Sequence, residues 1–125
     1  MEKQIATQLF ESLASGTRLD IYRLLVRYGH DGLVAGQIAA ELGLPPNNLS
    51  FHLKGMTQSR LLTVEQEGRF QRYRANLPLM RELIAYLTEE CCSAESKQCA
   101  SLRAASPCAE TVLPPLKRKT GKETP

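Results

Sequence analysis

The sequence predicts a mainly α-helical fold with one small β-hairpin, and three observations predict it. Apolar residues recur at helical spacing in most of the first 92 residues of this 125-residue chain. Two short runs of strand-forming residues flank Glu67-Gly68-Arg69, which is a hairpin signal. Beyond Cys99 the periodicity ends. We therefore expect one folded domain over residues 1–92 and a flexible, cysteine-containing tail over residues 93–125.

The first two expected helices cover residues 3–14 and 15–29. In the first, Ile5, Leu9 and Leu13 recur at i, i+4 and i+8. Ser15 suits the N-cap of the second helix, and Gly29 suits its C-terminal end. Residues 30–32 form a turn. Inside the second helix we expect a buried or nearly buried set of side chains: Leu19, Ile21, Tyr22, Leu24, Leu25 and Tyr28.

The next two expected helices cover residues 35–42 and 46–58, and Gly43-Leu44-Pro45 separates them. This pairing predicts a helix-turn-helix. At 100° per residue, the fourth helix turns Leu49, Leu53 and Met56 inward. Its opposite face carries Asn47, Phe51, Lys54 and Gln58, flanked by Ser50, Asn48 and His52.

The hairpin covers residues 61–76, and a last helix covers residues 77–92. In the hairpin we expect an inward set of Leu62, Val64, Tyr73 and Ala75 and an outward set of Arg69, Arg72 and Arg74. The last helix has one apolar stripe, made of Leu79, Met80, Leu83, Ile84 and Leu87. A helix-turn-helix followed by a basic hairpin predicts a winged helix.

The net charge of +3 is unevenly distributed along the chain. Residues 47–74 hold five basic and two acidic side chains, which favours a localised anion-binding face. The sequence contains neither a signal-peptide pattern nor an apolar run long enough to span a membrane. We expect a cytoplasmic protein without a membrane partner, in which the four cysteines are free, reactive or metal-binding rather than structural disulfides.

The winged helix and the basic segment predict binding to double-stranded DNA. The fourth helix would enter the major groove, where Asn47 and Asn48 can pair with base edges. On the wing, Arg69 would lie in or beside the minor groove. The expected phosphate contacts are Lys54, Arg72 and Arg74. Phe51, on the exposed face of the fourth helix, is also expected to contact DNA. The alternative is that these side chains form ordinary solvated surfaces.

His52 lies beside the inward stripe of the fourth helix. This position favours a hydrogen-bonded structural histidine, or one that contacts phosphate, over a metal ligand.

Apolar side chains on the first and last helices also predict a homodimer. Ile5 and Leu9 in the first helix, and Leu83 and Leu87 in the last, would pair across a two-fold axis. Such a dimer would place two recognition helices about 34–36 Å apart and read an inverted repeat. The alternative is that both helices close the core of a monomer.

Three segments resemble the ArsR/SmtB family of winged-helix repressors. LASGTRLDIYRLL (residues 13–25) is similar to the family's Leu-x-x-x-Thr-Arg-Leu-x-Ile-Leu helix. QIAAELGLPPNNLSFHLKGM (37–56) resembles its Leu-Ala-x-x-Leu-Gly … Leu-Ser-x-His-Leu helix-turn-helix, and EGRFQRYRAN (67–76) resembles its Gly-Arg-x-x-x-Tyr-Arg wing. The resemblance covers about residues 5–90.

The resemblance implies a dimeric repressor that binds its operator when empty and leaves it when a metal or metalloid binds. The implied DNA-reading positions are Asn47, Asn48, Ser50 and His52, with Arg69 on the wing. Both familiar inducer sites of the family are missing. Residues 33–36 lack the Cys-x-Cys of the arsenic site, and residues 77–92 lack the Asp and His of the zinc site.

The remaining candidate inducer site is formed by Cys91, Cys92 and Cys99. Three thiolates without imidazole or clustered carboxylate favour soft ions, and a pyramidal trivalent metalloid such as As(III) or Sb(III) suits three sulfurs. Zinc prefers four ligands, of which Cys108 could supply one. EECCSAESKQC (89–99) resembles the adjacent cysteine pair and third cysteine of some arsenic-responsive family members.

Besides the possibility that these thiols have no role, two functional alternatives to metalloid sensing remain open. One is a redox switch, and the other is sensing of another soft metal such as Cd, Pb or Hg. A thiol enzyme is disfavoured, because Glu89, Glu90 and the negative end of a helix all oppose thiolate formation. We expect Cys108, in the tail, to be dispensable.

Overall fold

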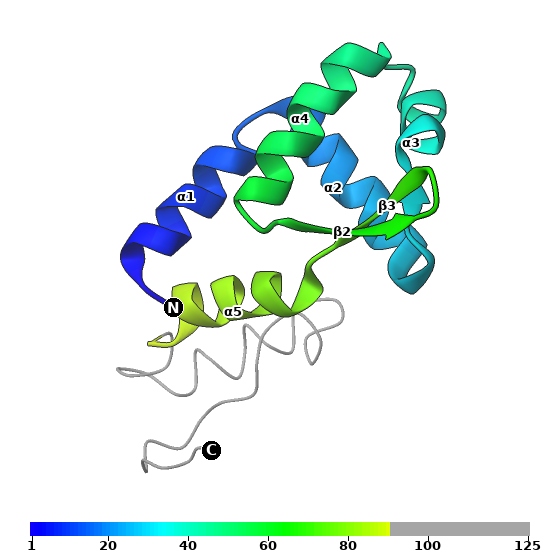
Figure 1. Ribbon diagram of the computed structural model, residues 1–125. Helices are drawn as coiled ribbons and strands as arrows, with labels where there is room; N and C mark the ends of the chain where they lie inside the picture. Colours follow the sequence, from blue (N-terminus) through cyan, green and yellow to red (C-terminus); the bar gives the residue numbers. More distant parts are fainter. Residues whose placement is uncertain (91–125) are drawn as a thin grey trace. The chain divides into compact units, whose positions relative to one another are not determined.

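The computed structural model describes residues 1–90, so Cys91, Cys92, Cys99 and Cys108 lie outside the described residues. Met1–Met80 form one compact unit, and the last helix begins at its end. Figure 1 shows the elements in chain order. They are α1 Lys3–Leu13, α2 Gly16–Tyr28, the 3-10 turn η1 Gly29–Asp31, β1 Leu33–Val34, α3 Ala35–Leu42, α4 Pro46–Gln58, β2 Leu62–Glu67, β3 Phe70–Ala75 and α5 Leu77–Thr88.

The helices begin and end close to the residues that the sequence predicts. The Ser15 hydroxyl caps α2 by accepting the Arg18 backbone N–H at 3.3 Å. Gly29 ends α2 with a φ of 56°, and Gly43 ends α3 in the left-handed conformation. Pro46 occupies the first turn of α4. Capping thus fixes the turn between α3 and α4, which form the helix-turn-helix.

The wing is a three-stranded antiparallel sheet in the order β1-β3-β2. The sequence predicts β2 and β3 but not β1, whose two residues are too few to show a pattern. Leu33 of β1 pairs with Tyr73, and Tyr73 also pairs with Val64 of β2. Gly32 makes the approach of β1 possible, because its φ is 61° and an added Cβ would collide with the Tyr73 carbonyl oxygen.

The core is aliphatic and gathers between the helices and the base of the sheet. Its fully buried members include Leu9, Ile21, Leu24, Leu25, Ile38, Leu49, Leu53, Met56 and Leu62. In α4 these are the three inward residues that the sequence predicts. The opposite face of α4 is therefore turned to solvent.

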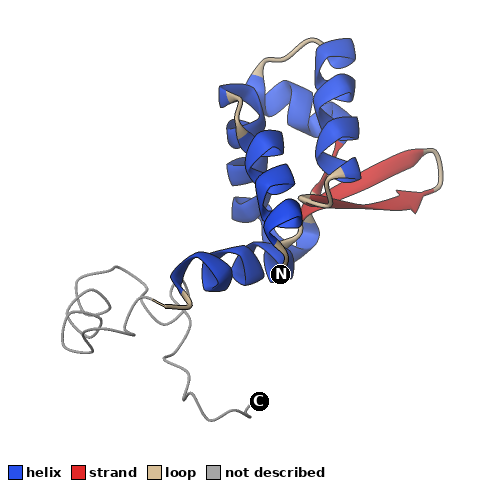
Figure 2. Cartoon of the chain, turned by 90° about the vertical axis from the view of Figure 1, so that its left-hand side faces the viewer, coloured by secondary structure: helices blue, strands red, loops and turns tan. Residues whose placement is uncertain are grey.

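Three residues expected inside the fold are exposed. Leu19 is 45% exposed because it lies on the far side of α2 from Ile21. Tyr28, the last residue of α2, is 39% exposed and donates its hydroxyl to Glu41 at 3.0 Å. Val64 is 40% exposed because only the first residue of β2 reaches the core. Figure 2 shows the hairpin extending away from the helices.

Two residues expected at a subunit interface are buried within the chain. Leu9 is 1% exposed and Leu83 is 2% exposed. In α1 the buried stripe is Ala6, Leu9 and Ser12, with spacing i, i+3, i+6. Ile5, the expected first member of this stripe, is instead 37% exposed. Contacts with a partner therefore cannot use Leu9.

Arg60, which links α4 to β2, has a φ of 72° and is the only non-glycine residue with a positive φ in the part of the chain that the structure describes. This conformation costs an L-residue about 1–2 kcal/mol, which glycine avoids at the expense of a larger unfolded-state entropy. We expect Arg60→Gly to raise the free energy of unfolding by about 0.5–1 kcal/mol. Urea unfolding at equal protein concentration measures this change.

Gln58→Gly is the matched control for Arg60→Gly. Gln58 is the last residue of α4 and has an ordinary helical backbone, so glycine there should lower the free energy of unfolding by about 1 kcal/mol or less. Equal losses in both variants would contradict the assignment of backbone strain to Arg60.

Candidate nucleic-acid interface

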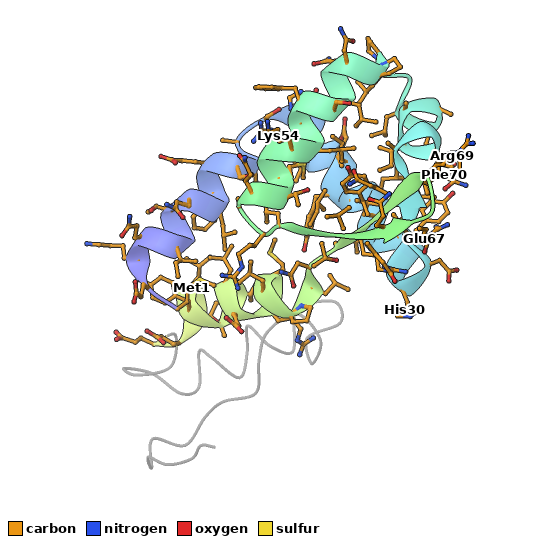
Figure 3. The ribbon with its side chains drawn as sticks, in the orientation of Figure 1. Met1, His30, Lys54, Glu67, Arg69 and Phe70 are labelled. Atoms are coloured by element: carbon orange, nitrogen blue, oxygen red, sulfur yellow. The ribbon has the colours of Figure 1, made fainter. Side chains whose placement is uncertain are left out.

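The exposed face of α4 carries the residues that the sequence assigns to DNA reading. Opposite the buried Leu49, Leu53 and Met56, the structure exposes Asn47, Asn48, Ser50, Phe51 and Lys54. We call this set the recognition face. Lys54 projects from α4 in Figure 3. A row of polar groups and one cation on a helix that is anchored from behind matches what a major groove accepts.

The N-terminal end of the recognition face is shaped by Asn47. Its side-chain oxygen accepts the Asn48 backbone N–H at 2.9 Å. This bond satisfies one of the N–H groups that helices leave unpaired in their first turn. The amide nitrogen of Asn47 remains available as a donor, and the positive end of the helix dipole favours a nearby phosphate.

His52 lies beside the recognition face and is half-buried. Arg18 of α2 donates its Nε–H to Nδ1 of His52 at 3.0 Å. Because Nδ1 accepts this bond, the neutral ring carries its proton on Nε2. Burial, and then the Arg18 charge, lower the pKa of His52 below its ordinary value of 6.5. His52 is thus a neutral, oriented side chain, as expected of a structural or phosphate-contacting histidine.

Arg18 also belongs to this interface, although the sequence does not predict a role for it there. It joins the recognition helix to α2 through His52, and its Nη1 approaches the carbonyl oxygen of Ser12 at 3.5 Å. A Cβ at Gly55 would lie only 2.6 Å from its Nη2. This contact explains why α4 has a glycine in its interior despite the helix propensity that glycine loses. The only sequence signal was the Thr17-Arg18-Leu19 motif.

The tip of the wing presents Arg69. Gly68 has a φ of 62°, as expected for the first residue of a two-residue hairpin turn that begins with glycine. The Gln66 side chain donates to the Gly68 carbonyl oxygen at 2.8 Å, which braces the turn. Arg69 and Phe70 are both exposed there (Figure 3). The tip can therefore place a cation in or beside a minor groove.

Arg72 and Arg74, which the sequence assigns to phosphate contact, each pair with a carboxylate in the structure. Arg72 pairs with Glu67 at 3.0 Å, and Arg74 pairs with Glu65 at 2.8 Å. Their guanidinium groups also donate to main-chain carbonyl oxygens of η1, at Asp31 and His30 respectively. Both side chains are half-buried and their charges are compensated. Arg72 and Arg74 thus connect β3 to both β2 and η1.

Comparisons with known proteins agree with this geometry. A helix-turn-helix domain family matches residues 13–65. Among curated proteins, none matches the chain. The solved structure of an ArsR-like transcriptional regulator from Rhodococcus sp. RHA1 is 21% identical, with a TM-score of 0.62, and the match covers 84% of this chain and 95% of that one.

The AntR antimony-specific transcriptional repressor is 32% identical, with a TM-score of 0.52, over 72% of this chain and 78% of AntR. This chain belongs to the ArsR family of winged-helix transcriptional regulators. It is a DNA-binding regulator and not an enzyme. The homodimeric winged helix-turn-helix domain of Mb0332 from Mycobacterium bovis, described as a possible ArsR-family transcriptional regulator, is 23% identical with a TM-score of 0.57 over 70% of this chain and 81% of that one.

Within residues 1–90, this ArsR-family regulator has no cluster of three His, Cys, Asp or Glu side chains that could hold a metal ion. Over the same residues, no helix is long and apolar enough to cross a membrane. Cys91, Cys92 and Cys99, which the sequence assigns to an inducer, lie outside the described residues. They remain the candidate inducer ligands on the evidence of the sequence.

The lowered pKa of His52 predicts a loss of stability in mild acid. Above about pH 6.5 the folded and unfolded chains both hold His52 neutral, so it adds no pH dependence. Below that pH the unfolded chain takes up a proton that the folded chain resists. As the pH is lowered below about 6.5, we therefore expect the free energy of unfolding to fall more steeply for the wild type than for His52→Asn.

Urea unfolding of both proteins across this pH range measures the difference. Asparagine keeps an acceptor near the position of Nδ1 but does not titrate, and the variant retains every other titratable group. Parallel pH profiles would contradict the placement of a neutral His52 against Arg18.

Proposed function

We propose that this chain is a cytoplasmic, metalloid-responsive repressor that binds operator DNA as a homodimer and leaves it when As(III) or Sb(III) binds Cys91, Cys92 and Cys99. The observation that carries the DNA-binding part is the recognition face of α4. Its polar groups are exposed on a helix whose other side is wholly buried. The support is the combination of this face with an exposed cation at the tip of the wing, Arg69.

The DNA contacts follow from the position of each group. Asn48 and Ser50 face base edges in the major groove, where asparagine can form a bidentate pair with adenine. Lys54 neutralises a phosphate, and Nε2–H of His52 can donate to another. Arg69 enters or flanks the minor groove from the wing tip. We assign Arg72 and Arg74 to holding the wing, because carboxylates already compensate both charges.

Exposed apolar side chains support a homodimer. Ile5 and Phe10 of α1 are 37% and 45% exposed, and Leu87 of α5 is 56% exposed. Burial of these apolar groups against a second copy of the chain lowers the free energy of the dimer. Mb0332 is described as homodimeric. A two-fold axis would place the two recognition helices about 34–36 Å apart, so the operator would be an inverted repeat.

Three thiols in one short segment that contains no imidazole support a soft, trivalent metalloid as the inducer. The AntR repressor, 32% identical, is described as antimony-specific. The chemistry balances without a redox partner: one arsenous acid and three thiols form three As–S bonds and release three water molecules. Each thiol proton leaves with a hydroxyl group of the acid, so no net proton enters the solution.

The test is a mobility-shift assay with an operator duplex selected by the protein from a random-sequence library. Binding should weaken with salt. Arsenite or antimonite should lower the affinity for the duplex by about 5–150-fold, whereas zinc should leave the affinity unchanged. Release by peroxide alone would favour a redox switch, and release by Cd, Pb or Hg but not by arsenite would favour another soft-metal sensor.

Proton release separates a metalloid from a metal ion at the same thiols. A divalent metal displaces protons from thiols, which are mostly protonated near pH 7 because the ordinary cysteine pKa is about 8.5. Binding of arsenite should instead leave an indicator dye unchanged in weakly buffered solution.

A further inference from the structure

Phe51 is an aromatic side chain in the middle of the polar recognition face. It is 67% exposed, more than any other large apolar side chain in the described part of the chain. It lies one turn after Asn47 and just under one turn before Lys54. Exposure alone is a weak indication of function, because single apolar side chains are common on protein surfaces. The way in which the ring is held is more informative.

Two neighbouring groups hold the Phe51 ring. The Arg18 guanidinium carbon lies 5.7 Å from the ring centroid, within the range of a cation–π contact. The His52 ring meets it edge-on, with centroids 5.6 Å apart and an interplanar angle of 67°. Arg18 is itself fixed by its bond to His52. These two contacts restrict the orientation of the exposed ring.

Gly55 provides the space in which Arg18 reaches Phe51. It lies one turn after Phe51 on α4, and a Cβ there would lie 2.6 Å from one terminal nitrogen of the guanidinium and 3.0 Å from the other. The glycine thus lets Arg18 lie against the base of the recognition face. The result is an apolar ring whose orientation is set before any DNA arrives, which lowers the entropy cost of binding.

The major groove offers such a ring one apolar partner. Base edges there display hydrogen-bond donors and acceptors, and the 5-methyl group of thymine is the apolar exception. We propose that Phe51 reads a thymine methyl group in each operator half-site, with Arg18 as the residue that positions the ring. This specificity rests on the proposed function, because it requires α4 to lie in the major groove.

The test uses the selected operator duplex, in which each thymine is replaced in turn by deoxyuridine. This replacement removes only the methyl group and keeps every hydrogen-bonding group of the base. For the wild type, one thymine in each half-site should show a loss of about fourfold in affinity, the amount expected for one buried methyl group. Equal affinity for every substituted duplex would overturn the proposal.

Phe51→Ala identifies the residue that makes the contact. This variant should bind the thymine duplex more weakly than the wild type does, and it should bind the thymine and uracil duplexes equally. Phe51→Leu should keep part of the preference. Lys54→Ala is the matched control, because it should weaken binding to both duplexes and leave their ratio unchanged. A preference for thymine that survives in Phe51→Ala would overturn the assignment.

Arg18→Met and Gly55→Ala test the positioning role. Methionine removes the charge, and the alanine methyl group displaces the guanidinium from its place over the helix. In both variants the thymine-to-uracil ratio should fall towards one, while thermal unfolding shows that the protein is folded. A folded variant with the wild-type ratio would overturn the role of Arg18.

Failure of the proposed function would look different from failure of this inference. If the selection yields no duplex that the wild type binds in a salt-dependent manner, the DNA-binding proposal itself fails. If the wild type binds its duplex but ignores the thymine methyl groups, only the role of Phe51 fails.

Discussion

Replacing Cys91, Cys92 or Cys99 singly by serine should leave operator affinity unchanged and abolish the release of DNA by arsenite. A serine hydroxyl is a hard ligand that does not replace thiolate at a soft trivalent ion. The wild type should lose about 5–150-fold in operator affinity on adding arsenite, which corresponds to a coupling of about 1–3 kcal/mol. Fluorescence anisotropy of a labelled operator, with and without arsenite, measures both quantities.

Cys108→Ser is the matched control for the three cysteine variants. It removes the fourth cysteine of the chain, and we expect it to respond to arsenite as the wild type does. If all of Cys91→Ser, Cys92→Ser and Cys99→Ser also respond normally, the inducer site lies elsewhere in the protein.

Asn48→Ala and Lys54→Ala should weaken DNA binding in two different ways. In the proposed complex Asn48 faces base edges, so alanine should lower affinity for the selected operator by about 5–150-fold in each half-site and relax the preference at one base pair. In the same complex we expect Lys54 to contact a phosphate, so alanine should weaken binding to all duplexes alike. It should also make the salt dependence shallower by about one unit per phosphate contact.

Affinities for operator and random duplexes, measured over a series of salt concentrations, separate the two effects. Arg72→Ala provides a contrast, because its charge is already paired with Glu67. It should change the salt dependence less than Lys54→Ala does. The reverse order would show that Arg72 gives up its carboxylate to reach a phosphate.

The helices and the recognition face could be predicted from sequence because they depend on local signals. Helical periodicity and the capping residues Ser15, Gly29 and Gly43 set the ends of the helices. The buried stripe of Leu49, Leu53 and Met56 then decides which side of α4 faces solvent. Periodicity gives the direction of a side chain, and this was enough to find the exposed polar row.

Contacts between residues far apart in the chain could not be predicted in this way. Arg18 and His52 are 34 positions apart, and no spacing rule joins them. The pairing of Arg74 with Glu65 depends on the register of the hairpin, which determines which residues are neighbours across the two strands. The sequence alone therefore indicates neither the ion pairs of Arg72 and Arg74 nor the contact with Arg18 that Gly55 makes possible.

An arsenite titration that follows thiol content and operator binding in the same sample shows whether metalloid binding to the thiols causes release of DNA. Three thiols per protomer should become unreactive over the same range of arsenite concentration in which the operator is released. Loss of the thiols with the operator still bound, or release of the operator with all thiols still reactive, would contradict this mechanism.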